Sequence, residues 1–182
     1  MRVREKLALV NKPYAEDVIV TGSRLKYCGR SYFTEVRHVS ALTAPRLTFT
    51  ASRFIVESPW GATITSQAMA PLLEDFYRKR AEEKLLPRVR HWERKTGLKA
   101  AGANIRLFQS RWASCDAGNV LQFHPRVMEL AGSVQDYIIV HELCHTIEKN
   151  HTKAFWSLVG QVMLGWRQEH EVLEQAAFGN AI

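Results

Sequence analysis

A chain of 182 residues is long enough for one well-cored domain and only marginally long enough for two small ones. Its apolar fraction of 46% and charged fraction of 24% are close to globular averages, which excludes collagen-like, coiled-coil and largely disordered proteins. No run approaches the roughly 18 consecutive apolar residues that a bilayer span needs. We therefore expect one domain over residues 1–182, with no membrane association.

The N-terminus and the cysteines both favour a cytoplasmic protein. The opening residues MRVREKLALV are basic and then briefly apolar, but the apolar run is too short for a signal peptide and no small-residue cleavage site follows it. The three cysteines, Cys28, Cys115 and Cys144, are odd in number and widely spaced, which fits neither a disulfide framework nor a paired zinc knuckle. We expect reduced thiols.

The formal charge of +7 comes largely from the span 78–99, which has the spacing of one long helix. Such a helix could face nucleic acid. The interpretation we favour is a solvated helix, because glutamates are interleaved with the basic residues, some of them four positions away. Nucleic acid is therefore a possible partner, but not the preferred one.

The part before residue 65 is β-rich. From 17 to 57, short β-forming runs alternate with turn residues, and the period-2 pattern is clearest in Ser31 to Val39. These runs predict an antiparallel meander.

The part from 66 to 182 begins with helical spacing over 66–96, where Pro87 is expected to kink or split the helix and Gly97 to end it. Strands are predicted at 104–109 and 119–123, paired as a hairpin.

Three more helices are predicted towards the C-terminus. The first covers 134–150 with one apolar face, with Ser133 as its N-cap and Asp136 near its positive end. Asn150 ends it in a left-handed conformation. The others cover about 152–164 and 167–178. Taken together, the elements predict an α+β fold.

The chemistry is concentrated in the first of these helices, where His141 to His145 read HExxH. That spacing places two imidazoles one turn apart on one helix face, where both can grip a single ion. Zinc suits neutral imidazole, and a catalytic site needs three protein ligands so that water can take the fourth place. His151, six residues further on, is the best candidate for the third ligand.

Glu142 is the candidate catalytic residue. It adjoins His141 and can lean towards the open side of the ion, take a proton from the zinc-bound water and return it to the leaving group. Composition alone would produce HExxH by chance in a few per cent of similar chains. The helical context and the third histidine make a zinc-dependent hydrolase the better interpretation.

Three segments together resemble the YgjP-like zinc metallopeptidases, which are similar to the SprT-like proteases. They are RWASC at 111–115, DYIIVHELCH at 136–145 and NHTKAFW at 150–156. The resemblance is strong from residue 77 onwards and only general in the strand-rich part. One departure is Ala113, where the family usually has glycine.

The resemblance implies a minimal zincin-like fold, with a long helix and a small twisted sheet packed on the HExxH helix, followed by C-terminal helices. It also implies His141, His145 and His151 as zinc ligands, Glu142 as the catalytic residue, and a peptide or protein substrate. An extended peptide would lie along an edge strand drawn from 104–123.

Other side chains are weaker candidates. Arg111 and Trp112 are candidate substrate-binding residues, with Arg111 either holding a substrate carboxylate, phosphate or developing oxyanion, or only stacking on Trp112 and pairing with an acidic residue of a helix. Cys144 is expected to pack the helix. Phe155 and Trp156 are expected to pack the next helix against it. The remaining histidines are expected to be ordinary, although His124 could approach the site.

Two other functions stay open at this stage. Family members have been described as nucleotide pyrophosphatases of the UTP type, and the basic helix mildly favours that activity, whereas the lack of a Gly-rich phosphate loop argues against it. The other is a DNA- or RNA-associated protein with a structural metal, which would need four protein ligands where the sequence offers three. Metals other than zinc also stay possible. The sequence does not predict an oligomeric state.

Overall fold

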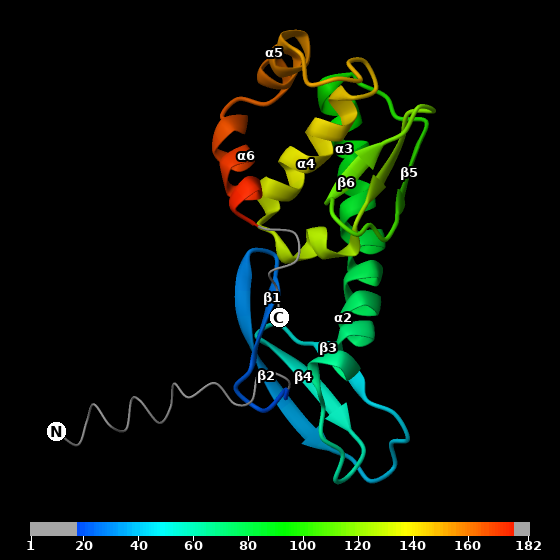
Figure 1. Ribbon diagram of the computed structural model, residues 1–182, viewed down its shortest axis with the longest axis vertical. Coiled ribbons are helices and arrows are strands. Elements are labelled where there is room, and N and C mark those ends of the chain that lie inside the picture. The colour runs from blue at the N-terminus through cyan, green and yellow to red at the C-terminus, as the bar shows by residue number, and fades with distance from the viewer. Residues whose placement is uncertain (1–17, 177–182) are drawn as a thin grey trace, which may run out of the picture. The chain divides into compact units, whose positions relative to one another are not determined.

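The computed structural model describes residues 18–176, and expectations for residues 1–17 and 177–182 lie outside that range. The chain divides into two compact units. One contains Met1–Arg24 and Phe33–Leu73, and the other contains Leu25–Tyr32 and Glu74–Ile182. Helices and two separate sheets confirm the α+β class (Figure 1). The single domain over 1–182 stays a prediction. Among the described residues, no helix is long and apolar enough to cross a membrane.

The first sheet has four strands, in the spatial order β1-β2-β4-β3. These are β1 (Arg24–Tyr27), β2 (Arg30–His38), β3 (Arg46–Phe49) and β4 (Arg53–Ser58). Strand β4 pairs antiparallel with β3 and parallel with β2. The predicted antiparallel meander is therefore wrong at one pairing, because β4 inserts between β2 and β3. Periodicity identifies strands and their faces, but it does not determine which strands become neighbours.

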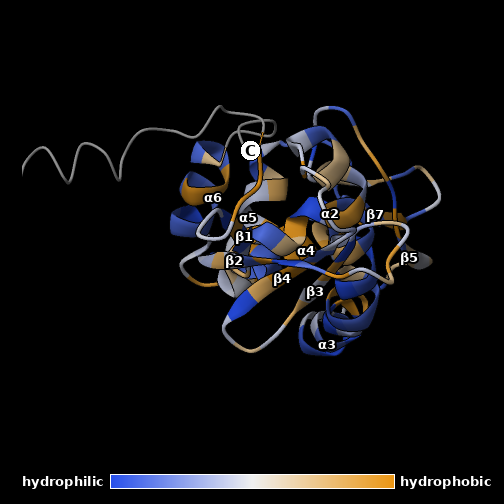
Figure 2. Cartoon of the chain, turned by 90° about the horizontal axis from the view of Figure 1, so that it is seen from below, coloured by the Kyte–Doolittle hydropathy of each residue, from blue (hydrophilic) through white to orange (hydrophobic). Residues whose placement is uncertain are grey.

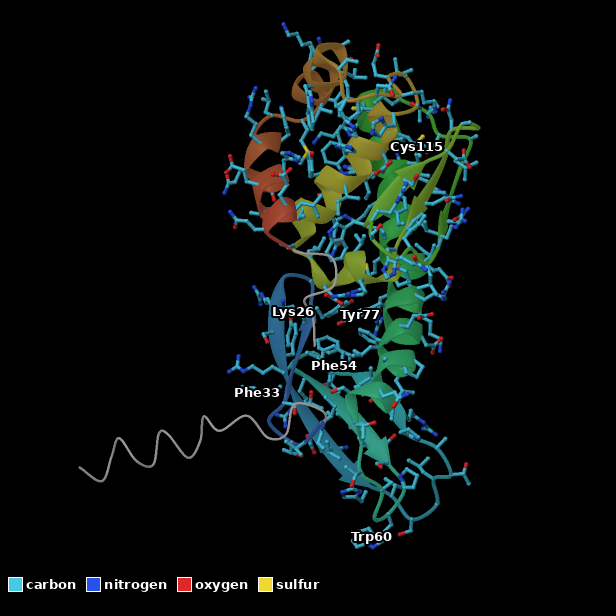
Figure 3. The ribbon with its side chains drawn as sticks, viewed as in Figure 1. Lys26, Phe33, Phe54, Trp60, Tyr77 and Cys115 are labelled. Atoms are coloured by element: carbon cyan, nitrogen blue, oxygen red, sulfur yellow. The ribbon has the colours of Figure 1, made fainter. Side chains whose placement is uncertain are left out.

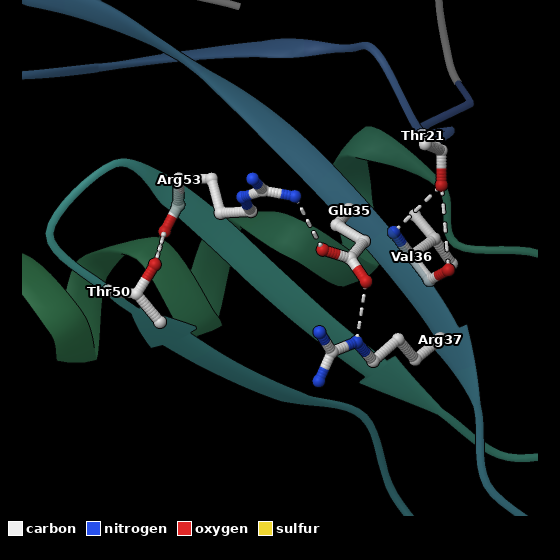
Figure 4. Close-up of polar contacts among 6 residues, drawn as sticks. All are labelled: Thr21, Glu35, Val36, Arg37, Thr50 and Arg53. Atoms are coloured by element: carbon white, nitrogen blue, oxygen red, sulfur yellow. Dashed lines mark hydrogen bonds and ion pairs between the residues drawn. The ribbon is translucent and has the colours of Figure 1, made fainter.

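Inside the first unit, the alternation of β4 produces the core. Phe54, which is labelled in Figure 3, and Val56 are fully buried, while Ile55 between them is partly exposed. The charged side chains of this sheet that pair with one another stay at the surface. Glu35 accepts from Arg37 at 2.7 Å and from Arg53 at 3.1 Å (Figure 4).

The long predicted helix is present but divided. It consists of α2 (Ser66–Arg80), a π-helical turn η1 (Ala81–Leu85) and α3 (Leu86–Thr96), with Pro87 in the first turn of α3. Proline has no N–H to donate, so a wider turn just before it is a physically reasonable place for the division. Gly97 ends α3 at φ 77°, as predicted.

The second sheet has three strands, ordered β5-β7-β6. They are β5 (Gly102–Ile105), β6 (Ala113–Cys115) and β7 (Val120–Phe123). The predicted hairpin between 104–109 and 119–123 is wrong, because those strands pair in parallel. The antiparallel partner of β7 is β6, which forms within the segment expected to be a loop. Strand β6 is thus an edge of this sheet, and it packs against α4 (Gly132–Cys144).

Helix α4 is enclosed on all sides. It follows the short helix η2 (Pro125–Glu129) and packs against α3, β6, α5 (Lys153–Val162) and α6 (Trp166–Gln175). Most of its residues are buried, and Figure 2 shows much of it in the hydrophobic colour. The predicted single apolar face is therefore wrong. A helix with apolar residues all round is typical of a core position.

The predicted cap of this helix is also wrong, because α4 begins at Gly132 with Ala131 as its N-cap. Asp136 instead accepts from Arg88 Nε at 3.0 Å and from Trp92 Nε1 at 2.7 Å. Arg88 also donates to the Gln135 side chain at 2.9 Å and to the Gly132 carbonyl at 2.8 Å. This cluster around Arg88 fastens the first turns of α4 to α3.

A contact of α2 fixes a further backbone segment of the second unit. The Tyr77 hydroxyl donates to the Lys26 carbonyl (Figure 3).

Gly29 lies against the backbone of Ala131, where an added Cβ would come within 2.7 Å of Ala131 Cα, and its φ is 76°. Both conditions require glycine there.

Candidate metal centre

The HExxH segment occupies the last turn of α4 and the residue after it. The helix ends at Cys144 and His145 is its C-cap, with αR backbone angles. The prediction that the helix runs to Asn150 and ends there in a left-handed conformation is wrong, since Asn150 has no positive φ. The chain turns at 145–148 instead and reaches α5 with Thr152 as N-cap. The earlier turn brings His151 back to the motif.

The structure brings the three candidate ligands together. His141, His145 and His151 each offer a ligand atom, and these atoms lie within 4.8 Å of one another. The Nε2 atoms of His141 and His151 are 2.9 Å apart. Tetrahedral zinc with bonds of about 2.05 Å separates its nitrogens by about 3.3 Å, a spacing inside this range. The cluster therefore fits one small cation.

The outer nitrogens of the rings are engaged by the protein. His145 Nδ1 lies 2.9 Å from the Glu148 carbonyl oxygen, which can only accept, so this nitrogen carries the proton. Its Nε2 is left with a free lone pair for a metal. His141 Nδ1 contacts the Tyr137 hydroxyl at 3.1 Å. The donor set therefore fits a metal that prefers neutral imidazole.

Burial favours the neutral form of His141 and His145. It lowers the pKa of His141 to about 3, with further lowering by the neighbouring His145 and His151. Burial also lowers the pKa of His145, against the hydrogen bond to the Glu148 carbonyl. The Phe155 ring stacks on His145 at 4.4 Å between centroids, and Trp156 stacks on Trp166 at 4.8 Å.

Glu142 lies on the same helix, buried to 7% exposure. Burial raises the pKa of its carboxyl to about 8, while Arg111 and a hydrogen bond from the Cys115 backbone act in the opposite direction. A cation held by the histidines would also favour the ionised form. The Cys115 amide belongs to strand β6, so the sheet edge and α4 meet at this carboxylate.

A cavity of about 290 Å³ opens beside Glu142 and His141. Its lining combines apolar side chains, among them Ile138 and Leu173, with Arg111, Trp112 and Glu174. The cavity lies between α4, α6 and the segment that leads into β6.

The two candidate substrate-binding residues both line this cavity, but the predicted stacking of Arg111 on Trp112 is not formed. Arg111 lies 5.8 Å from the Phe108 ring centroid, and the guanidinium over Trp112 is that of Arg126, at 5.9 Å. Arg111 has no ion pair with any of the residues 18–176. Its charge acts on Glu142, whose pKa it lowers.

Several other expectations can be compared with the structure. Cys144 is fully buried, as expected of a packing residue. His124 does not join the ligand cluster; its Nδ1 accepts from the Arg126 amide at 3.1 Å and begins η2. Ala113 has no positive φ, so the glycine it replaces is not required for backbone conformation.

Sequence reasoning missed Tyr137 and His170. Tyr137 stands four residues before His141, a spacing that could have indicated contact on one helix face. His170, expected to be ordinary, lies 2.9 Å by its Nδ1 from the Tyr137 hydroxyl. It comes from α6, and no local sequence pattern links that helix to the motif.

Residues 1–176 match the family described as "YgjP-like, metallopeptidase domain". The chain belongs to this family. The predicted resemblance is thereby confirmed, and with it the expectation of a metallohydrolase of the peptidase class. Membership in a YgjP-like metallopeptidase family also implies a divalent metal, for which the three histidines are a fitting group.

Two solved structures are similar to about half of this chain. The metallopeptidase zymogen of Pyrococcus abyssi abylysin is 22% identical, with a TM-score of 0.46, over 55% of this chain and 98% of that one. The metallopeptidase zymogen of Methanocaldococcus jannaschii jannalysin is 19% identical, with a TM-score of 0.46, over 51% of this chain and 96% of that one. No protein of curated function matches the chain.

Proposed function

We propose that this protein is a zinc-dependent peptidase in which His141, His145 and His151 hold the ion and Glu142 is the general base. The observation that carries the proposal is the convergence of three ring nitrogens within 4.8 Å, beside a buried carboxylate. Bound zinc would act as a Lewis acid on a carbonyl oxygen and make a water molecule more acidic.

The proposed role of Glu142 is proton transfer. Its carboxylate takes a proton from the attacking water and gives it to the leaving amine nitrogen. The Cys115 amide, which hydrogen-bonds this carboxylate, holds it in place during both transfers. Arg111 favours the ionised form that a base requires.

The hydrogen bonds of β6 indicate how a peptide would lie. The Trp112 carbonyl accepts from the His124 amide at 2.8 Å, and the Asp116 amide donates to the Val120 carbonyl at 3.1 Å. The backbone N–H and C=O groups of the even-numbered residues of this segment therefore face β7. By alternation, the Ala113 amide and carbonyl face away from β7, on the side of Cys115. We propose that a substrate strand pairs with Ala113 there.

The cavity would then receive a substrate side chain. Ile138, Leu173 and Trp112 suit an apolar stem, and Arg111 adds a positive charge to a lining that also holds the carboxylate of Glu174. A side chain with an apolar stem and a polar end that can contact Arg111 matches this combination. Arg111 and Trp112 are accordingly proposed to bind substrate.

The experiment compares Glu142→Gln with wild-type protein on fluorescein-labelled casein, with zinc content measured in both. We expect Glu142→Gln to retain one zinc per chain and to lose cleavage by at least about 100-fold, the lower end for general base catalysis. Glu82→Gln is the matched control, since Glu82 is exposed and lies in η1.

Two outcomes would overturn the proposal. One is a Glu142→Gln protein that cleaves casein as wild type does. The other is a zinc-loaded wild-type protein that leaves casein intact but releases pyrophosphate from nucleoside triphosphates, because that activity would require a phosphate-containing substrate instead of a peptide.

A further inference from the structure

The Tyr137 hydroxyl lies between two histidine rings. It is 3.1 Å from His141 Nδ1 and 2.9 Å from His170 Nδ1. The Tyr137 side chain is fully buried, and its ring stacks on Trp166 at 6.4 Å with an interplanar angle of 12°. The position of the hydroxyl is therefore fixed, and both contacts must be hydrogen bonds with a donor and an acceptor.

The chemistry of the groups determines the direction of these bonds. If His141 binds a metal through Nε2, its neutral ring carries the proton on Nδ1 and donates it to the Tyr137 oxygen. The hydroxyl proton of Tyr137 is then available for His170 Nδ1. His170 must therefore carry its own proton on Nε2, the atom that lies 3.3 Å from Glu174 Oε1.

We propose that Tyr137 and His170 form a hydrogen-bonded relay that orients His141 and fixes its tautomer, with the Glu174 carboxylate beside the other ring nitrogen of His170. Tyr137 and His170 are positioning residues in this scheme, since they act on the metal through His141. The relay rests on the proposed function, because its direction follows from metal binding at His141 Nε2. Helix α6 would thus support the metal centre without supplying a ligand.

The two histidines of the HExxH motif differ in how they are oriented. His145 donates to the Glu148 carbonyl, three residues away in its own turn. His141 depends on Tyr137 and, through it, on a residue 33 positions from Tyr137 in sequence. Partners of this kind typically contribute 10–100-fold to metal affinity. Changes in α6 should therefore affect the orientation of the His141 ring and leave that of His145 unchanged.

The first test measures zinc affinity by competition with a chelator. Tyr137→Phe keeps the buried ring and removes only the hydroxyl, so we expect zinc to bind about 10–100-fold more weakly. His170→Leu should weaken binding by a smaller factor, and His170→Gln should recover part of that loss, because the amide oxygen can accept from Tyr137. Wild-type affinity in Tyr137→Phe would overturn the relay.

The second test reads the tautomer directly, by ¹⁵N NMR of the histidine rings in the zinc-loaded protein. We expect His170 to carry its proton on Nε2 in wild type and to lose that preference in Tyr137→Phe. A His170 ring protonated on Nδ1 in wild type would overturn the proposal. A merely structural role of Tyr137 would lower the melting temperature without changing either readout. If Tyr137→Phe does not fold, the His170 variants decide by themselves.

Matched controls on α6 separate the relay from general charge effects. Glu174→Gln and Glu171→Gln make the same change in charge three positions apart, and only Glu174 contacts His170. The Glu174 side chain is 69% exposed, so we expect Glu174→Gln to change zinc affinity by no more than about threefold and Glu171→Gln not at all. A larger effect of Glu171→Gln would contradict the relay.

Failure of the relay and failure of the proposed function give different results. If His145→Ala binds zinc as tightly as wild type, the metal site itself is wrongly assigned. If His145→Ala loses zinc while Tyr137→Phe retains wild-type affinity, the site stands and only the relay fails.

Discussion

In the four-stranded sheet, Glu35 pairs with two arginines at the surface, whereas at the candidate metal centre Glu142 and His145 are buried. The arginines beside Glu35 are about half exposed, at 50% and 54%. Water competes for every such contact. Burial, by contrast, disfavours the charged form of a group, and for this reason His141 and Glu142 have large pKa shifts.

The largest effect should come from removing a ligand. We expect His151→Ala to weaken zinc binding by more than the 10–100-fold that an outer partner contributes, because a site of three ligands becomes a site of two. Chelator competition measures it. His91→Ala is the control, since His91 is an exposed histidine of α3. Equal zinc affinities of His151→Ala and wild type would show that the cluster of three histidines is not a metal site.

The next largest effect should come from the cluster around Arg88. Arg88→Met removes the partner of Asp136, whose side chain is 25% exposed, and we expect a loss of about 1–3 kcal/mol in the free energy of unfolding. Urea denaturation measures this loss. Arg90→Met is the matched control, because Arg90 is exposed and lies about half a turn further along the same helix. Equal losses in the two variants would contradict the assigned role of Arg88.

An enclosed titratable group should make stability depend on pH. Burial lowers the pKa of His124 to about 4, with Arg126 and Arg78 lowering it further and Glu74 opposing them. The unfolded chain, with a pKa near 6.5, takes up a proton first as pH falls. The contribution of neutral His124 to the free energy of unfolding is therefore complete above about pH 6.5. This contribution, on the order of 2 kcal/mol, is lost as the pH falls towards 4.

The variant for this prediction is His124→Asn, which can still accept from the Arg126 amide but does not titrate there. Its unfolding free energy is subtracted from that of wild type at pH 4.5 and pH 7. We expect the unfolding free energy of wild type minus that of the variant to be larger at pH 7 than at pH 4.5. A difference that is constant with pH would show that His124 titrates alike in the folded and unfolded chain.

The smallest effect is expected in the sheet. Hydrogen bonds from Arg37 and Arg53 lower the pKa of the Glu35 carboxyl, and Glu35→Gln removes the negative charge that these arginines contact, but the contacts are exposed. We expect the melting temperature to stay within the scatter of repeated scans of wild type. A clear decrease would mean that the surface ion pairs of β2 and β4 matter as much as enclosed ones, and the contrast between the two regions would disappear.

Much of the local structure could be predicted from the sequence. The α+β class, the end of α3 at Gly97 and the three histidines of the candidate site all follow from short-range patterns of residues. Two histidines at HExxH spacing share a helix face wherever the helix forms, and His151 is too near in sequence to be far away in space.

The pairing of the strands could not be predicted in the same way. Alternation identified β2 and β4 without revealing that they are parallel neighbours, and β6 is too short to produce a pattern of its own. The cap at Ser133 failed because Arg88, on another helix, holds the first turn of α4 at Gly132. Long-range packing outweighs local preference in both cases.

The sequence by itself determined the chemical types at the metal centre, because HExxH and a nearby histidine define a ligand set within eleven residues. Only the tertiary structure decided what surrounds that set. Tyr137 meets His170, and Glu142 meets the Cys115 amide, across separations that no periodic pattern spans. These partners are brought together by the burial of α4 on all sides, which depends on the packing of the elements around it.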